Sequence, residues 1–239
     1  MIPFPEEPPR PRRVEIAPGA VHLPGWLTLA QQVKLVDACR EWARGPVPMR
    51  HTRLPGGGIM SVQTVHLGWY WRPYRYSRTA DGYNGARVAE LPDWLADLGR
   101  SAVAAASDDQ DPEAVVAAAA YRPDVALVNY YDREAKLGMH QDKEERSDAP
   151  VVSLSIGDRC VFRFGNTENR NRPWTDVELA SGDAFVFGGP SRFAYHGVPK
   201  LYPDSGPGET GLTSGRLNLT LRVTGIAAAE TEGAEQRQA

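Results

Sequence analysis

Alternating polar and apolar side chains at positions 216–223 restrict this segment to an extended strand. Successive side chains on a strand point to opposite faces, so one face is polar and the other apolar. The polar residues are Arg216, Asn218, Thr220 and Arg222, and they alternate with Leu217, Leu219, Leu221 and Val223. Two interpretations fit the pattern: a half-exposed strand whose polar face contacts water, or a strand whose polar face lines a site.

Short β-rich runs of this kind dominate the chain after Asp124. They are separated by Gly, Asn and Asp residues, which favour turns, and they lie at 150–156, 159–164, 183–187 and 216–224. This spacing is typical of barrels and of cupin-like jelly rolls built from two sheets. We therefore predict a mainly β fold with flanking helices.

Two segments have the apolar periodicity of amphipathic helices. The first runs from Leu29 to Ala43, and Thr28 and Gln31 have the spacing of a capping box at its start. The second runs from Trp94 to Ala106. Both helices are expected to pack against a sheet.

The length and composition suit a single domain. A chain of 239 residues with 41% hydrophobic residues can bury one sizeable core. We expect that domain at 15–225, between a flexible N-terminal arm at 1–14 and a flexible C-terminal tail at 226–239. Two glycine-rich segments, Gly56–Gly58 and 202–215, are expected to be loops.

Several features argue for a cytoplasmic protein, which we expect to be a monomer. The two cysteines, Cys39 and Cys160, lack the spacing of a disulfide framework or a zinc site. We also find neither an export signal nor an apolar run long enough to cross a membrane. The net charge of −3 excludes a globally basic nucleic-acid binder but allows local basic patches.

A His-x-Asp pair and a distant histidine form a candidate metal site. On an extended strand, His140 and Asp142 point to the same face, where His196 can join them. Nitrogen and carboxylate ligands suit iron, manganese or zinc, and three protein ligands leave positions open for a substrate. The alternative is a polar pair in a turn.

The polar face of the strand at 216–223 would suit a dicarboxylate co-substrate beside that metal. Arginine binds carboxylates through two parallel hydrogen bonds. Arg216 and Arg222 are separated by roughly 20 Å along a strand, so they cannot bind the same end of a small acid. We expect Arg216 to bind the far carboxylate and Arg222 to lean toward the metal end, near Asp142.

Residues 66–76 concentrate five aromatic residues and two arginines within eleven positions. Bases stack on aromatic rings and arginine binds phosphates, so this segment is a candidate nucleic-acid platform. A packed aromatic cluster in the protein interior is the alternative.

From about residue 15 to 225, the sequence resembles the AlkB family of Fe(II)- and 2-oxoglutarate-dependent nucleic-acid dealkylases. The similar motifs occur in the family's order: His66-Leu67-Gly68-Trp69, Asn129-Tyr130-Tyr131, Ala135-Lys136-Leu137, His140-Gln141-Asp142-Lys143, 149–155, Gly188-Gly189-Pro190-Ser191-Arg192, Tyr195-His196-Gly197 and 216–222. The resemblance implies a double-stranded β-helix with an N-terminal substrate lid at about 50–78.

The resemblance also implies residue roles. The Fe(II) ligands would be His140, Asp142 and His196, which with Arg222 form the catalytic set. Binding of 2-oxoglutarate would involve Asn129, Tyr131, Leu137, Ser153, Arg216, Asn218 and Arg222. Substrate binding would involve Trp69, Tyr74, Tyr76 and Glu144, with Trp69 stacking on the target base.

Two departures from the family pattern concern substrate choice. The interval between Trp69 and the tyrosine pair is about two residues shorter than in the better-known bacterial members, and Glu144 replaces a shorter aspartate. The preferred substrate therefore cannot be transferred from the family.

The activity implied is oxidative demethylation of N-alkylated bases in single- or double-stranded DNA, with RNA as an alternative. O2 would be the oxidant and formaldehyde would be released from lesions such as 1-methyladenine and 3-methylcytosine. The alternatives are an oxygenase acting on a protein or small metabolite and a non-catalytic reader of methylated nucleic acid.

Overall fold

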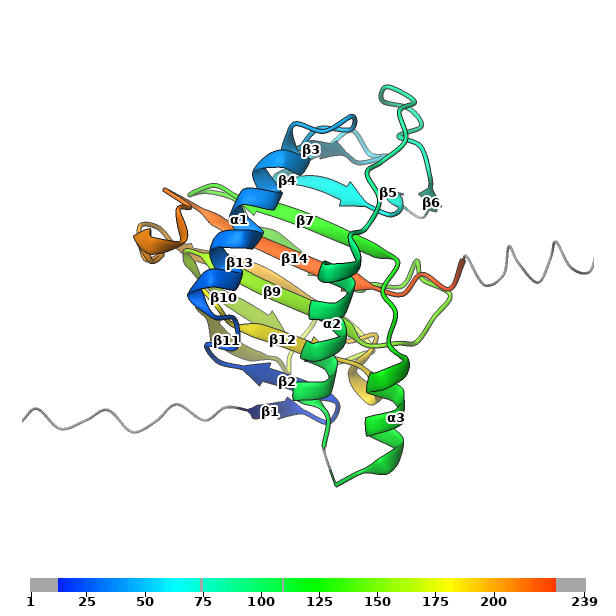
Figure 1. Cartoon of the computed structure of the whole chain (residues 1–239), viewed down its shortest axis with the longest axis vertical. Coiled ribbons are helices and arrows are strands. Elements are labelled where there is room, and N and C mark those ends of the chain that lie inside the picture. The colour runs from blue at the N-terminus through cyan, green and yellow to red at the C-terminus, as the bar shows by residue number, and fades with distance from the viewer. Residues whose placement is uncertain (1–12, 74, 109, 227–239) are drawn as a thin grey trace, which may run out of the picture.

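The computed structural model describes residues 13–73, 75–108 and 110–226, and its centre is two facing antiparallel sheets (Figure 1). The large sheet contains, in spatial order, β1 (Val14–Ala17), β2 (Ala20–Leu23), β12 (Ala184–Phe187), β9 (Val151–Gly157), β14 (Arg216–Arg222), β7 (Val125–Tyr131), β4 (Ile59–Leu67) and β3 (Arg50–Arg53). The small sheet contains β11 (Thr175–Leu179), β10 (Arg159–Phe164), β13 (His196–Tyr202) and β8 (Leu137–His140). This arrangement is the double-stranded β-helix, or jelly roll, that the sequence predicted.

Helices cover the outer face of the large sheet. Figure 1 shows α1 (Leu29–Ala43) and α2 (Asp93–Ala106) lying across this sheet, with α3 (Pro112–Ala120) beside α2. The capping box at the start of α1 is present, because Thr28 and Gln31 each bond the backbone N–H of the other. The apolar core between the helices and the sheet includes Leu35, Leu95 and Leu219, none of them accessible to solvent.

A second apolar core fills the space between the two sheets. It includes four phenylalanines on β10 and β12: Phe162, Phe164, Phe185 and Phe187. The two cysteines are free thiols in different cores, with Cys39 in the helix-side core and Cys160 in the core between the sheets. The inter-sheet core gives way to polar side chains where β8 and β13 meet β14, and that is where the candidate site lies.

The lid segment forms the edge of the large sheet and a separate hairpin. Strands β3 and β4 end the large sheet, and β5 (Tyr70–Arg72) pairs with β6 (Arg75–Ser77). The glycine segment Gly56–Gly58 lies in the turn joining β3 to β4, as predicted, while 202–215 contains a short 3-10 helix at Gly208–Thr210. Another 3-10 turn lies at Gly189–Ser191.

Some expectations lie outside the described residues. Tyr74, most of the N-terminal arm at 1–14 and most of the C-terminal tail at 226–239 are among them. The single-domain boundaries at 15–225 stay a prediction. Within the described part of the chain, no helix combines the length and apolarity required to cross a bilayer.

Candidate active site

Two histidines and one aspartate meet where β8 pairs with β13. His140 is the last residue of β8 and lies opposite His196, the first residue of β13. Asp142 follows two residues after His140, and each of the three side chains offers a ligand atom within 4.8 Å of the others. The Nε2 atoms of both histidines lie 3.6 Å from the carboxylate oxygens of Asp142. The structure therefore assembles the triad that the sequence predicted.

The backbone orients both imidazole rings toward this point. Nδ1 of His140 lies 3.0 Å from the carbonyl oxygen of Gly138, and Nδ1 of His196 lies 2.9 Å from that of Ala194. A carbonyl oxygen only accepts, so each Nδ1 carries the proton and each Nε2 keeps a free lone pair. Burial, with a contribution from His140, lowers the pKa of His196 to about 4, which keeps this ring neutral near pH 7.

Asp142 is ionised and has an oxygen free to bind a metal. Burial alone would raise its pKa, but Arg222 and the two histidines outweigh that effect and lower the pKa to about 2. Nη2 of Arg222 donates to Oδ1 at 2.7 Å, whereas the buried Oδ2 has no hydrogen-bond partner among the described residues. A buried, unpaired carboxylate oxygen is costly unless it binds a cation. Two imidazoles and one carboxylate are the donor set of a non-haem Fe(II) site with open positions, so this triad fits iron.

A closed polar cavity adjoins the triad beneath the middle of the large sheet. All seven residues expected to bind 2-oxoglutarate line it together with His140 and His196: Asn129, Tyr131, Leu137, Ser153, Arg216, Asn218 and Arg222. All seven residues of β14 are buried, because this strand lies in the middle of the large sheet, with helices covering one face and the small sheet facing the other. The interpretation of this strand as half-exposed is therefore wrong.

The guanidinium of Arg216 lines this cavity and has no carboxylate partner among the described residues. It is 1% exposed, and Nη2 donates to Oγ of Ser155 at 2.9 Å. Its Nε and Nη1 have no hydrogen-bond partner among the described residues. Burial raises the pKa of neighbouring Tyr131 to about 12, so this phenol keeps its proton and can donate it in a hydrogen bond. Unpaired buried donors are unfavourable without a ligand, and they suit a carboxylate.

Other cavity residues are held by hydrogen bonds between strands and within β14. Oδ1 of Asn129 accepts from Oγ1 of Thr64 at 2.8 Å, and Nδ2 of Asn218 donates to Oγ of Ser153 at 2.7 Å. Oγ1 of Thr220 donates to Oδ1 of Asn218 at 3.0 Å. These bonds fix polar groups on four adjacent strands, β9, β14, β7 and β4, before a ligand binds.

A second, wider pocket opens on the other side of the triad, toward the lid. Its lining includes Leu54, Trp71, Leu127, Glu144 and Arg170, and it shares Asn129, Leu137, His140 and Arg222 with the closed cavity. The two spaces therefore meet at the triad. A molecule in the lid-side pocket would face the same metal as a co-substrate in the closed cavity.

The comparisons with known proteins agree with this geometry. The model of the 2OG-Fe(II) oxygenase superfamily matches residues 19–222. An alpha-ketoglutarate-dependent dioxygenase AlkB homolog from Caulobacter vibrioides is 36% identical over 214 residues, which cover 87% of this chain and 88% of the relative. The chain belongs to the AlkB family.

The chain is also similar to a longer protein from a plant and to a solved structure. A DNA N(6)-methyladenine demethylase from Arabidopsis thaliana, ALKBH1D, is 34% identical over 224 residues, which are 87% of this chain and 50% of the relative. The chain thus spans about half the length of this relative. The solved structure of OsALKBH1 superimposes with a TM-score of 0.75 at 31% identity, covering 88% of this chain and 99% of that one.

The expected substrate residues Glu144 and Trp69 lie in different surroundings. Glu144 lines the lid-side pocket. Trp69 is 3% exposed and outside the pocket lining, its Nε1 donates to Asp124 at 3.1 Å, and the guanidinium of Arg78 covers its ring at 3.7 Å. The tryptophan in the pocket is Trp71, whose buried Nε1 has no partner among the described residues.

Tyr76 belongs to a buried network that the sequence did not reveal. Its hydroxyl donates to Glu145 at 2.5 Å, and Glu145 also accepts from Nη1 of Arg222 at 3.0 Å and Nη2 of Arg192 at 3.2 Å. Arg192 further donates to the carbonyl oxygens of Asp142 and Ala149, both at 2.8 Å. The network therefore holds both the backbone of a triad residue and the arginine that contacts its side chain.

The sequence contained a partial signal for this network. Arg192 ends the Gly188–Arg192 motif shared with the AlkB family, but the motif alone does not indicate a role for this arginine. Glu145 lies among the charged residues Lys143 to Arg146, a pattern typical of a solvated loop, yet its side chain is completely buried.

Proposed function

We propose that this protein is an Fe(II)- and 2-oxoglutarate-dependent dioxygenase that demethylates N-alkylated nucleic-acid bases. The observation that carries the proposal is the junction of the two pockets at the triad. One pocket is closed and polar and ends at the unpaired guanidinium of Arg216. The other is open and contains an indole, an acidic group and an exposed arginine, Arg170.

His140, Asp142 and His196 would hold Fe(II). When bound, the metal supplies oxidation of a methyl C–H bond by O2, coupled to conversion of 2-oxoglutarate to succinate and CO2. One oxygen atom enters succinate and the other the methyl group. The resulting N-hydroxymethyl group is released as formaldehyde, its hydroxyl proton passes to solvent, and the ring nitrogen keeps the electron pair of the broken C–N bond.

The chain's own residues would position 2-oxoglutarate. Arg216 offers two free N–H groups and Tyr131 one O–H to the far carboxylate, which supports binding in a single direction. Arg222 lies at the metal end, where its contacts with Asp142 and Glu145 keep its guanidinium in place. The buried walls of the cavity exclude water, which strengthens these charged contacts.

The lid-side pocket would bind the alkylated base. A methyl group on a ring nitrogen is inaccessible within a duplex, so the nucleotide must be unpaired or flipped. We assign the stacking role to Trp71 instead of Trp69, because Trp71 lines the pocket. Glu144 is half-buried in the same pocket and can accept a hydrogen bond from an exocyclic amine such as that of 1-methyladenine or 3-methylcytosine.

The name of the Arabidopsis thaliana relative, a DNA demethylase, supports a nucleic-acid substrate. DNA is the class we propose, with RNA as the alternative that the assay distinguishes. We also propose that the chain acts as a cytoplasmic monomer. Size-exclusion chromatography with light scattering would measure its oligomeric state.

The direct test supplies Fe(II), 2-oxoglutarate and O2 with a set of methylated DNA and RNA oligonucleotides. Mass spectrometry should detect loss of a methyl group, with matching amounts of succinate and formaldehyde. Asp142→Ala should abolish all three products. The control, Glu178→Gln, alters an exposed carboxylate paired with Arg159 and should leave them unchanged.

Two outcomes would contradict the proposal. Succinate formation stimulated by peptides or small metabolites, but by no oligonucleotide, would favour an oxygenase of another substrate class. Tight binding of methylated oligonucleotides without any succinate would favour a non-catalytic reader.

A further inference from the structure

Thr64 lies on β4 in a row of polar residues that crosses the large sheet. The residue directly opposite on β3 is Arg50, and the one on β7 is Asn129, which itself lies opposite Asn218 on β14. Directly opposite side chains on neighbouring strands are close enough to interact. Thr64 is 4% exposed and belongs to none of the sequence motifs that indicated the site. Its neighbours in this row decide what its hydroxyl can do.

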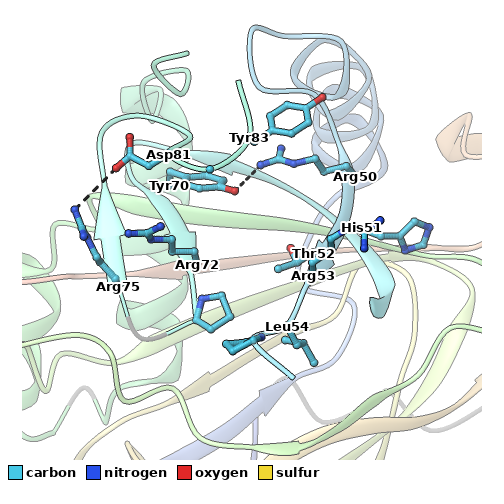
Figure 2. Close-up of a pocket in the computed structure, with 13 residues that line it drawn as sticks. Arg50, His51, Thr52, Arg53, Leu54, Tyr70, Arg72, Arg75, Asp81 and Tyr83 are labelled. Atoms are coloured by element: carbon cyan, nitrogen blue, oxygen red, sulfur yellow. Dashed lines mark hydrogen bonds and ion pairs between the residues drawn. The ribbon is translucent and has the colours of Figure 1, made fainter. Parts of the chain in front are cut away.

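The neighbour on β3 does not bind this hydroxyl. Arg50 donates to the hydroxyl of Tyr70 at 2.7 Å and to the carbonyl oxygen of Pro48 at 3.0 Å. Figure 2 shows its guanidinium directed toward Tyr70 and lying beside the ring of Tyr83. Among the described residues, the partner of the Thr64 hydroxyl is therefore Asn129.

The bond between Thr64 and Asn129 leaves the nitrogen of the amide free. Oγ1 of Thr64 donates to Oδ1 of Asn129 at 2.8 Å, and both side chains are buried. An amide presents its oxygen and its nitrogen in different directions, and the nitrogen carries two donors. Nδ2 of Asn129 has no hydrogen-bond partner among the described residues, and Asn129 lines the closed cavity. Its N–H groups are therefore available to a ligand there.

The next asparagine in the row, Asn218, is held much more firmly. Its Nδ2 donates to Oγ of Ser153 at 2.7 Å and to the carbonyl oxygen of Leu154 at 3.2 Å. The side chain of Asn129 has one partner among the described residues, the hydroxyl of Thr64. The orientation of the Asn129 amide thus depends on a single hydrogen bond.

The loss of this bond would leave a buried acceptor unpaired. An unpaired buried acceptor is costly, so the amide of Asn129 would turn to find another donor. The last torsion of an asparagine side chain is soft, which permits this rotation. The rotation would move Nδ2 away from a bound carboxylate and bring Oδ1 toward it, and two oxygens with negative charge repel each other. Threonine prevents the rotation, because its branched side chain has few rotamers and fixes the direction of the hydroxyl.

We propose that Thr64 is a positioning residue for 2-oxoglutarate: its hydroxyl holds the amide of Asn129 so that Nδ2 donates to the bound co-substrate. Thr64 lines the lid-side pocket and lies outside the lining of the closed cavity, so it acts through Asn129, which lines both. This inference rests on the proposed function and adds to it a residue on the substrate side of the metal. Binding of the co-substrate thus depends on a hydroxyl that belongs to the other pocket.

The experiment compares wild type with Thr64→Val, which has the same shape without the hydroxyl, and Thr64→Ser, which keeps the hydroxyl. The control is Thr210→Val. Thr210 is completely buried, its hydroxyl donates to the carbonyl oxygen of Pro207 at 3.1 Å, and it lines neither pocket. Isothermal titration measures the binding of 2-oxoglutarate to each protein loaded with Mn(II) in place of Fe(II). Thermal unfolding checks that each variant is folded.

Thr64→Val should weaken 2-oxoglutarate binding by about fivefold or more, the effect expected for one buried hydrogen bond. Thr64→Ser should retain most of the affinity, and Thr210→Val should bind like wild type. The affinity for Mn(II) should stay the same in all four proteins, because neither threonine is a metal ligand. Unchanged 2-oxoglutarate binding in Thr64→Val would overturn the inference. So would an equal loss in Thr64→Ser, since serine keeps the hydroxyl.

A double-mutant cycle tests whether Thr64 acts through Asn129. In the background of Asn129→Ala, the amide is absent, so Thr64→Val should weaken 2-oxoglutarate binding no further. A second loss of the same size as in the wild-type background would mean that Thr64 acts through the fold or through another residue. That result would contradict the inference.

The titrations need no methylated substrate, so they separate this inference from the proposed function. If wild type binds 2-oxoglutarate but demethylates no oligonucleotide, the proposed function fails, while the affinities of the variants still decide the role of Thr64. If wild type binds no 2-oxoglutarate, both are overturned. In turnover, Thr64→Val should raise the KM for 2-oxoglutarate and keep kcat near the wild-type value. A fall in kcat with an unchanged KM would contradict the positioning role.

Discussion

Replacing Glu145 by Gln should destabilise the protein although the two side chains have the same shape. Glu145 is completely buried between two arginines that are also buried, Arg192 at 1% and Arg222 at 6% side-chain exposure. Burial alone would raise the pKa of Glu145, but Arg222 outweighs this effect and the pKa is lowered, so the carboxyl is ionised. The substitution therefore removes a charge from an interior position without creating a cavity.

The size of the effect follows from the charges left behind. Two guanidiniums would then face one remaining carboxylate, that of Asp142. Removing one partner of a buried pair costs about 3–5 kcal/mol. The amide oxygen of Gln can still accept one hydrogen bond, which restores about 1 kcal/mol. We expect a loss of about 2–4 kcal/mol in the free energy of unfolding.

Urea denaturation of the metal-free protein near pH 7 measures this loss, using circular dichroism and tryptophan fluorescence together. Glu178→Gln is the matched control, because its exposed pair with Arg159 should contribute no more than about 1 kcal/mol. A second readout is the 2-oxoglutarate requirement, which should rise because Arg222 loses one of its two anchors. A change in unfolding free energy below about 0.5 kcal/mol for Glu145→Gln would refute the argument that the buried charge matters.

Three further predictions address other parts of the site. Arg216→Ala should weaken 2-oxoglutarate binding by on the order of 1.5–3 kcal/mol, the value of a charge-assisted bond, and Arg216→Lys should restore only part of this loss. Isothermal titration of 2-oxoglutarate, with a redox-inert metal in place of iron, measures the affinity. Unchanged binding would place the far carboxylate elsewhere. Trp71→Ala should weaken methylated oligonucleotide binding by about 1–3 kcal/mol, whereas Trp69→Ala should mainly lower the melting temperature; the reverse result would restore the stacking role to Trp69. Burial raises the pKa of Cys39 to about 12, so the thiol stays protonated. Iodoacetamide at pH 8 should therefore modify Cys39 only after unfolding. Stoichiometric labelling of the folded protein would contradict the burial of this thiol.

The elements foreseen from the sequence are those with strong local signals. The first helix was predicted at Leu29–Ala43 and found there, because the capping box and the apolar periodicity depend on neighbouring residues. The helix α3 was not foreseen, although Asp111 caps its N-terminus and Pro112 occupies its first position. The short strands β1 and β2 were also missed, since four residues carry too little periodicity to identify a strand.

The triad and the polar cavity beside it were predictable for a different reason. His140 and Asp142 are two positions apart, so local geometry brings them together, and the alternation of β14 set its polar groups on one face. Which way this face pointed was a question of tertiary structure. Strands β7 and β9 pair with β14 on both sides, and the bond between Thr64 and Asn129 joins residues 65 positions apart. No pattern within the strand contains that information.

The two tryptophans of the lid show how one backbone conformation limits this kind of reasoning. Trp69 and Trp71 are two positions apart, so an uninterrupted strand would point both to the same face. The chain instead bends at Gly68 and Trp69, so that Trp69 lies outside β5. At Gly68, φ is +76° and a Cβ atom would lie 2.0 Å from the carbonyl oxygen of Asp124. Only glycine adopts this conformation in that space. The turn places Trp69 before β5, against Asp124, and leaves Trp71 on the hairpin facing the pocket. Sequence alternation therefore identifies an aromatic platform here, but the turn at Gly68 decides which ring a base can reach.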